Sequence, residues 1–333
     1  MSLKFLKALM SLKSLGSLGS LGSLGFLGAI ASCTSHTGEG EMEPAAIGFH
    51  THRIEEVGTR ALISTTEDLR MLGFGVYGDK TVGTSSPSPQ LVFDNIMVSG
   101  TSWGYEPTKY WDRTAAYRFV AYAPWAESVT SYNPENKKLT IEDIPQWQEV
   151  NSDVKDYLVA TSANTAETYI SDYGGTVSLA FQHILAQLTV NIAKVSAANY
   201  IVKGLSFVSV PTGDDCTCSY DSSNESLSFI GGSTPGNQEL VSDDFTVDLS
   251  PKKLAHYLVA PFDLGAEIQL YLTYSLGSSG PKTVPVPLGI TKFESNHSYV
   301  FNLRFEAGSN ISVSVTEVKN WETIEVTDDV YNW

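Results

Sequence analysis

The sequence predicts an all-β protein that consists of two antiparallel β-sandwich domains in tandem. Apolar and polar residues alternate with a period of two along most of the 333 residues, which is typical of antiparallel strands with one buried face. The segments between these runs are rich in glycine, serine, proline and asparagine, as in Gly83–Pro89, and indicate turns. A helical period of 3.6 residues is not sustained anywhere; only residues 164–173 are predicted as a short helix.

The first predicted strand covers residues 47–52 and turns Ile47, Phe49 and Thr51 to one side. About fourteen strands fit two sandwiches of about seven strands each. We place the domain boundary after residue 173, so that the N-terminal sandwich spans 61–173 and the C-terminal sandwich spans 174–333. The later predicted strands are 71–77, 91–98, 117–122, 157–159, 177–181, 188–192, 205–207, 227–229, 245–249, 257–259, 268–272, 299–303 and 311–315.

The N-terminus predicts an export signal. Residues 1–32 combine a lysine-containing start with a weakly apolar run and end in Ile-Ala-Ser before Cys33. This arrangement is typical of a lipoprotein signal peptide that is removed between Ser32 and Cys33. We therefore expect the thiol of Cys33 to be acylated, for example with palmitate, and to tether the chain to a membrane. Residues 33–60 then form a tether followed by the first strand.

The composition limits the partners and the redox chemistry. A formal net charge of −16 without a basic cluster argues against nucleic acid and against anionic lipid surfaces. Besides Cys33, the chain has only Cys216 and Cys218, which would point to the same face of a strand. The sequence leaves open whether these two residues form a disulfide or remain separate thiols.

No group of residues in the sequence indicates catalysis, a cofactor or a metal. The six histidines are scattered, and the sequence predicts neither a phosphate loop nor a nucleophile elbow, in which Gly-x-Ser-x-Gly leads from a strand into a helix. The run that begins Gly73-Phe74-Gly75 lacks the helix that would follow in a dinucleotide fingerprint. We expect His183 to be a core residue and adjacent acids such as Asp214 and Asp215 to lie in solvated loops, with a calcium site as the alternative for such acids. Four tryptophans are also assigned to the core by default, with a sugar-binding platform as the alternative: Trp103, Trp111, Trp125 and Trp147.

Several short motifs, taken in order, carry a resemblance to a known family. The order of these motifs is similar to that of the fimbrillin family of Bacteroidales, the pilin-like lipoproteins of the major, minor and Mfa-like types. The motifs are the cysteine Cys33, Thr-Arg-Ala at 59–61, Gly-Val-Tyr-Gly at 75–78, Lys-Tyr-Trp at 109–111, Phe-Val-Ala-Tyr-Ala-Pro at 119–124, Asp-Tyr-Leu-Val-Ala at 156–160, Phe-Gln-His-Ile-Leu-Ala-Gln-Leu at 181–188 and Val-Lys-Asn-Trp at 318–321.

The resemblance implies a fold and a mechanism of assembly. Family members have two transthyretin-like β-sandwich domains and reach the outer membrane as lipoproteins. An arginine-specific protease then removes the first strand, and a strand from a neighbouring subunit fills the vacated groove to build a fimbria. In this chain the cut would fall after Arg60 and make Ala61 the new N-terminus, which would release residues 33–60. The resemblance therefore implies a non-enzymatic subunit of fimbriae that acts in cell adhesion, with a host or bacterial surface ligand as a further partner.

Two rival functions remain open at this stage, and so does the role of the C-terminal tail. The chain could instead be a monomeric surface lipoprotein that binds glycans or a host protein, or an uncut anchor subunit of the fimbria. The tail has the alternating residues Ile324 and Val326, which suit either a donor strand or the last edge strand of the second sandwich. The sequence also does not decide whether the fimbria is a homopolymer or a heteropolymer.

Overall fold

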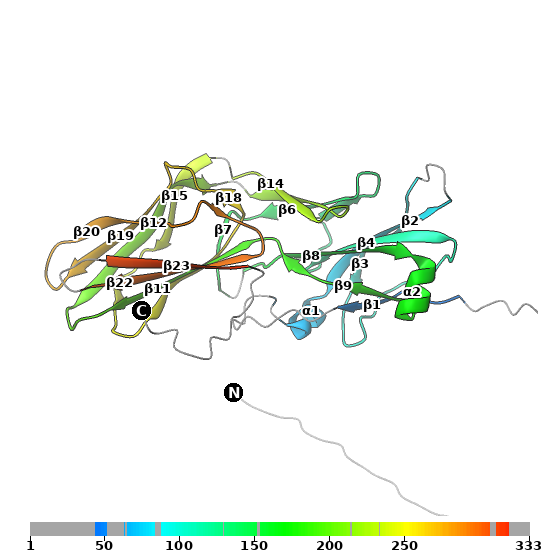
Figure 1. Ribbon diagram of the computed structural model, residues 1–333, viewed down its shortest axis with the longest axis horizontal. Helices are drawn as coiled ribbons and strands as arrows, with labels where there is room; N and C mark the ends of the chain where they lie inside the picture. The colour runs from blue at the N-terminus through cyan, green and yellow to red at the C-terminus, as the bar shows by residue number, and fades with distance from the viewer. Residues whose placement is uncertain are drawn as a thin grey trace, which may run out of the picture. The chain divides into compact units, whose positions relative to one another are not determined.

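Figure 1 shows the computed structural model of the chain, whose described residues lie mostly in β-strands. The structure describes residues 44–51, 63, 65–83, 88–128, 130–151, 154–213, 215–232, 234–306 and 311–319. Within these residues there are two short helices, α1 (Thr66–Leu72) and α2 (Ala166–Tyr173), and several separate sheets. This architecture confirms the predicted all-β fold of packed sandwiches. None of the helices in the described ranges is long and apolar enough to cross a membrane.

A five-stranded antiparallel sheet, here called the central sheet, organises the first half of the chain. Its strand β4 is a nearly continuous apolar run, and successive side chains point alternately into two different core clusters. Phe119 and Ala121 face one core cluster, whereas Val120 and Tyr122 face another. A strand with this pattern must be covered on both faces. In spatial order the central sheet contains β10 (Gln182–His183), β8 (Leu158–Thr165), β4 (Ala115–Ala123), β2 (Phe74–Val82) and β3 (Gln90–Val98).

One face of the central sheet is covered by a two-stranded pair and by α2. The pair joins β1 (Gly48–Thr51) to β9 (Thr176–Leu179) in parallel. Residues from β1, β9 and α2 share a single buried cluster with the inward residues of the central sheet. Because these segments lie far apart in the sequence, this core depends on long-range packing.

The other face of the central sheet is covered by a four-stranded antiparallel sheet, here called the bridging sheet. It combines two strands from before residue 173 with two strands from after it. The bridging sheet contains β14 (Ser226–Ile230), β13 (Cys216–Asp221), β6 (Lys138–Ile144) and β5 (Thr130–Asn133). Strand pairing therefore crosses the predicted domain boundary, which itself stays a prediction.

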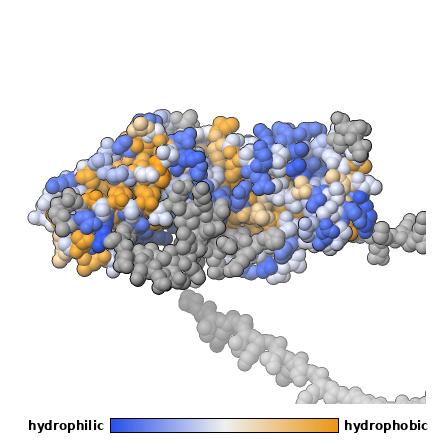
Figure 2. All heavy atoms as spheres, in the orientation of Figure 1, coloured by the Kyte–Doolittle hydropathy of each residue, from blue (hydrophilic) through white to orange (hydrophobic). Residues whose placement is uncertain are grey.

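The second half of the chain packs two larger sheets against one core, in which Tyr200 stacks on Phe305 with ring centroids 4.2 Å apart. In the view of Figure 2, hydrophobic residues are concentrated over this half. One sheet has the order β23 (Ile311–Lys319), β22 (His297–Phe305), β11 (Ala186–Lys194), β17 (Lys252–Val259) and β7 (Trp147–Glu149). The other has the order β15 (Thr234–Val241), β12 (Tyr200–Thr212), β19 (Gln269–Leu276) and β20 (Lys282–Val286), with β16 (Phe245–Thr246) beside β12 and a separate pair of β18 (Phe262–Asp263) and β21 (Lys292–Phe293).

The direction of some strand pairs and the start of one predicted strand differ from the sequence-based expectation. The pairs β1–β9 and β11–β22 are parallel rather than antiparallel, because in each case a long connection lets the chain return in the same direction. In addition, the predicted strand 71–77 begins too early, since Met71 and Leu72 belong to α1. A capping box between Thr65 and Asp68 starts this helix, and Gly73 at φ 71° ends it.

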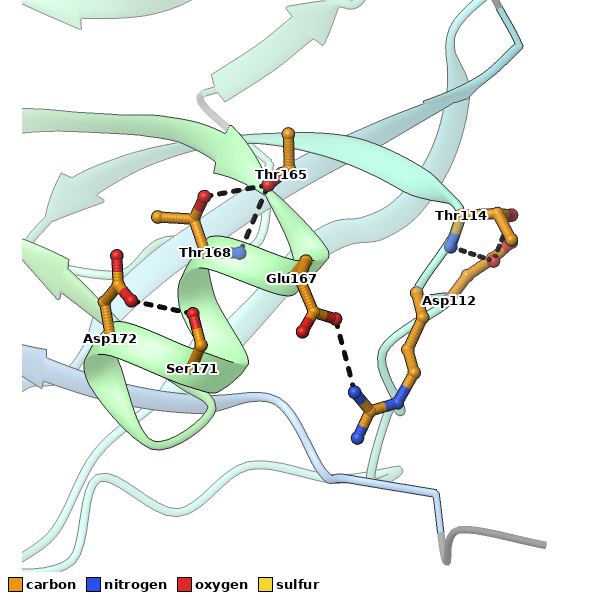
Figure 3. Close-up of polar contacts among 8 residues, drawn as sticks. Asp112, Thr114, Thr165, Glu167, Thr168, Ser171 and Asp172 are labelled. Carbon is orange, nitrogen blue, oxygen red and sulfur yellow. Dashed lines mark hydrogen bonds and ion pairs between the residues drawn. The ribbon is translucent and has the colours of Figure 1, made fainter. Parts of the chain in front are cut away.

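The predicted helix at 164–173 is confirmed as α2. The hydroxyl of Thr165 accepts a hydrogen bond from the backbone N–H of Thr168 (3.1 Å), and Gly174 ends the helix in the left-handed conformation. Figure 3 shows this cap and the side chain of Glu167. Glu167 forms an ion pair with Arg113 (3.3 Å), which connects α2 to the loop before β4. This ion pair holds α2 next to the loop before β4.

Candidate assembly site around strand β1

Strand β1 follows the alternation that its sequence predicts. Ile47, Phe49 and Thr51 are buried, with exposed fractions of 2%, 5% and 4%, whereas His50 between them is exposed. The predicted inward face of this strand is therefore confirmed. A four-residue strand adds little backbone pairing, so its attachment depends mainly on these inward side chains.

Phe49 lies at the centre of an aromatic pocket. Four rings meet its ring edge to face, and three of these rings come from strands of the central sheet. The distances between ring centroids are 6.3 Å to Phe74, 5.5 Å to Phe93, 5.7 Å to Phe119 and 5.5 Å to Tyr105. Edge-to-face pairs add about 0.5–1.5 kcal/mol each to the burial of the ring, so Phe49 is the main side-chain anchor of β1.

The backbone of β1 and of Ile47, the residue before it, is bonded on both sides. On one side the N–H of Gly48 donates to the carbonyl of Gly175 (3.0 Å), immediately before β9. On the other side the N–H of Ile47 donates to the carbonyl of Lys109 (2.9 Å), and the hydroxyl of Tyr105 donates to the carbonyl of Ile47 (2.7 Å). The strand thus fills a slot between β9 and the segment 105–111.

Gly175 has to be glycine at this position. Its φ is +80°, and a Cβ atom would lie 3.3 Å from the carbonyl oxygen of Ala46 and 3.4 Å from Nε1 of Trp111. That indole N–H donates to the carbonyl of Gly175 (3.1 Å), and Tyr169 of α2 stacks on the indole at 4.9 Å. The wall of the slot is therefore rigid and is supported from behind by α2.

The loop next to Trp111 is fixed by charge. The hydroxyl of Thr114 donates to Asp112 (2.7 Å), as Figure 3 shows, and the ammonium of Lys80 donates to the same carboxylate (2.9 Å). These two bonds, the one from Thr114 first, lower the pKa of Asp112 to about 2. The carboxylate therefore stays ionised over the whole physiological range and holds the loop against β2.

Ile63 is anchored to the body of the protein independently of β1. Its side chain is 3% exposed, and its backbone N–H donates to Oδ2 of Asp156 (3.1 Å). The other oxygen of this buried carboxylate, Oδ1, lies 2.9 Å from Nδ1 of His183. His183 is thus a core histidine, as predicted, whereas Asp156 is a residue whose role the sequence reasoning missed, because its partner Ile63 lies far away in the sequence.

The predicted processing residues lie outside the described part of the chain. These are Ser32 and Cys33, at the signal cleavage and lipidation site, and Arg60 and Ala61, at the protease site. All four therefore stay predictions. The described residues on either side of the protease site are Thr51, at the end of β1, and Ile63.

Cys216 and Cys218 are free thiols in the structure, so no bridge joins them. Alternate residues of a strand are about 6.6 Å apart with parallel Cβ bonds, which is at the limit of disulfide geometry. The Cys216 thiol instead donates to Oε1 of Gln146 (2.9 Å). Burial raises the pKa of the Cys218 thiol to about 12, so both residues serve the core of the bridging sheet.

The four tryptophans considered as a sugar-binding platform instead pack in the core. Trp103 and Trp111 are buried, and Trp125 and Trp147 are partly buried against core clusters. This agrees with the assignment of these residues to the core rather than to a sugar platform. Across the ranges that the structure describes, no three histidine, cysteine or acidic side chains gather in a way that would hold a metal ion.

The fold and this site define an all-β sandwich protein whose N-terminal strand fills a slot in the core. The chain belongs to the fimbrillin-like family, whose model matches residues 59–321. This membership confirms the resemblance inferred from the motifs and the prediction that the chain is not an enzyme. The chain is accordingly a fimbrial subunit that associates with other subunits in a fimbria at the cell surface.

Solved structures show the same fold at low sequence identity. A fimbrial protein from Bacteroides vulgatus ATCC 8482 is 16% identical with a TM-score of 0.56, over 83% of this chain and 99% of that one. A candidate cell adhesion protein from Bacteroides uniformis ATCC 8492 is 15% identical with a TM-score of 0.51, over 84% of this chain and 98% of that one. No curated protein matches this chain.

Proposed function

We propose that this fimbrial subunit is exported as a lipoprotein, cut after Arg60 and polymerised by strand exchange. Acylated Cys33 holds the precursor at the outer membrane until the cut releases residues 33–60. The slot left by β1 then receives a strand from another subunit. Strand addition of this kind combines backbone hydrogen bonds with side-chain pockets.

The attachment of β1 is the observation that carries this proposal. Within the described residues, β1 forms its ladder with β9 alone and belongs to none of the larger sheets. Its departure would leave those sheets paired as they are. It would also expose the backbone groups of β9 and an aromatic pocket, which together form a template for another strand.

The anchoring of Ile63 supports a cut at Arg60. Residues 52–62 connect β1 to Ile63, and Arg60 lies within this connection, close to its downstream end. Because Asp156 holds the backbone of Ile63, the segment after the cut stays attached while the segment before it is released. The match to the family model starts at residue 59 and leaves β1 outside, which is consistent with a first strand that is not part of the mature subunit.

The two large inward side chains supply part of the energy that would hold a replacement strand. Burying a large apolar side chain is worth about 1.5–3 kcal/mol, so the positions of Ile47 and Phe49 supply about 3–6 kcal/mol. A contact between the groove of one subunit and the strand of the next is heterologous. Repetition of such a contact gives an open filament rather than a closed ring.

Replacement of Arg60 tests the proposal. We expect Arg60→Ala to block both removal of residues 33–60 and polymerisation while the subunit still folds and is still acylated at Cys33. Arg53→Ala is the matched control, because Arg53 is the other arginine of the 52–62 connection, and it should polymerise normally. The readouts are detergent-resistant ladders on gels, labelling with radioactive palmitate and circular dichroism.

Normal fibres from Arg60→Ala would refute the processing step. A wild-type chain that is cut after Arg60 and nevertheless remains monomeric would favour a ligand-binding surface lipoprotein. A chain that is incorporated into fibres while uncut and acylated would indicate an anchor subunit.

A further inference from the structure

The slot of β1 has three inward positions with different requirements, and these restrict which strand can replace it. The first position is filled by Ile47, the second by Phe49 and the third by Thr51, all nearly fully buried. The second position is the most demanding, since four rings surround it and fix its size and shape. A smaller residue there would leave a cavity within packed aromatic side chains.

The third position accepts a small uncharged residue. The hydroxyl of Thr51 is buried and finds no hydrogen-bond partner among the described residues. A site that does not satisfy a neutral hydroxyl is a poor environment for a carboxylate, whose burial without a partner costs far more. The replacement strand should therefore carry an aliphatic residue, a phenylalanine and a small uncharged residue at alternate positions.

The C-terminal tail of this chain does not meet these requirements. Among residues 320–333, every set of three alternate residues contains at least one aspartate or glutamate. The best register places Ile324 at the first position, but it then places Val326 in the aromatic pocket and Asp328 at the third position. This conclusion holds for either strand direction, because reversing a set does not change its members.

We infer that the slot of β1 selects a donor strand of the pattern aliphatic-x-Phe-x-small, and that it rejects residues 320–333 of a second copy. The inference rests on the proposed strand exchange and adds the side-chain pattern of the donor strand to it. The residue that enforces the choice is the phenylalanine in the pocket formed by Phe74, Phe93, Phe119 and Tyr105.

Peptide binding to the subunit cut after Arg60 tests this selection. The probes are fluorescent peptides of residues 44–52 and of residues 320–333, measured by fluorescence anisotropy after the released segment has been removed. We expect the 44–52 peptide to bind and its Phe49→Val form to bind at least about tenfold more weakly. A His50→Gln form is the control for an exposed position and should bind within about twofold of the parent peptide.

The tail peptide supplies the decisive comparison. The unchanged 320–333 peptide should not bind at concentrations that saturate the 44–52 peptide. The same peptide with Val326→Phe and Asp328→Thr carries the required pattern and should gain binding. In the uncut subunit, Phe49→Val should lower the melting temperature more than His50→Gln does, which reports on the pocket even if the cut subunit unfolds.

The outcomes separate this inference from the function on which it rests. If the 44–52 peptide binds but the unchanged tail peptide binds equally well, the selection is wrong and the strand exchange stands. Equal binding of the Phe49→Val peptide would also overturn the selection. If the uncut subunit is stable but the cut subunit binds none of the peptides, the exchangeable slot itself is refuted, and the inference fails with it.

Discussion

At the scale of single residues, the buried carboxylate of Asp156 has the most specific role. It accepts a hydrogen bond from the backbone of Ile63 and lies beside Nδ1 of His183. Through these two contacts it fixes the point where the chain enters the sandwich after the predicted cut. We therefore expect Asp156 to maintain the local order of the chain around Ile63.

The substitution Asp156→Asn tests this anchor. We expect it to lower the free energy of unfolding by about 1.5–3 kcal/mol, the usual contribution of a buried hydrogen bond to a charged group. It should also speed hydrogen exchange at the amide of Ile63. Asp172→Asn, at an exposed residue near the end of α2, is the control. An unchanged exchange rate at Ile63 would contradict the anchoring role.

A second residue makes the stability depend on pH. His256 is buried in β17, and burial, followed by the charge of Lys253, lowers its pKa to about 4 from 6.5. The amide of Gln187, whose oxygen accepts a bond from Ser298 (2.8 Å), donates to Nε2 of His256 (2.9 Å). The imidazole is therefore neutral in the folded state at pH 7.

The sign of the pH effect follows from this low pKa. Below pH 6.5 the unfolded chain binds a proton at His256, while the folded chain does not until about pH 4, so the free energy of unfolding falls as the pH drops through this window. The expected loss is up to about 3 kcal/mol. Urea unfolding at several pH values should show a shallower loss for His256→Gln than for the wild type. Equal slopes would contradict the assignment.

At the scale of elements, the packing of the bridging sheet can be tested through the reactivity of two buried thiols. Its strand β13 turns both Cys216 and Cys218 into the core against the central sheet. We expect neither thiol to react with a disulfide reagent at pH 8 in the folded subunit, and both to react after unfolding in urea. Rapid labelling of the native protein would mean that β13 and β14 do not cover the central sheet as described.

Elements with local signals could be predicted from the sequence, and elements defined by distant pairing could not. The alternation of Ile47, Phe49 and Thr51 predicts β1 and its inward face correctly. The capping box of Thr65 and Asp68 was also a local signal, but it was overlooked, so α1 was missed. The parallel pairing of β1 with β9 and the joining of β6 with β13 bring together residues from distant parts of the chain, and the alternation is the same for any partner strand.

The candidate site was predictable only in part for the same reason. The sequence identifies Phe49 as an inward residue, but it does not indicate that Tyr105 and three phenylalanines surround it. Likewise, nothing local to Asp156 points to the backbone of Ile63, which lies more than ninety residues earlier in the chain. Such contacts arise when the sheets pack and have no signature in a short window of sequence.

At the scale of the whole molecule, the described residues combine interlocked sheets with strand β1, which belongs to none of the larger sheets. The bridging sheet and the β7–β17 pair join segments from both sides of residue 173. Strand β1, in contrast, has a ladder of four residue pairs with β9 and is held largely by Phe49. The proposed strand exchange requires this difference, because a subunit would then lose β1 and accept another strand without rearranging its main sheets.

The most direct test of this account is the N-terminus of the subunit within purified fibres, determined by mass spectrometry. The account predicts that polymerised chains begin at Ala61 and lack both β1 and the acylated cysteine. Fibres whose subunits still begin at acylated Cys33 and retain residues 33–60 would contradict it.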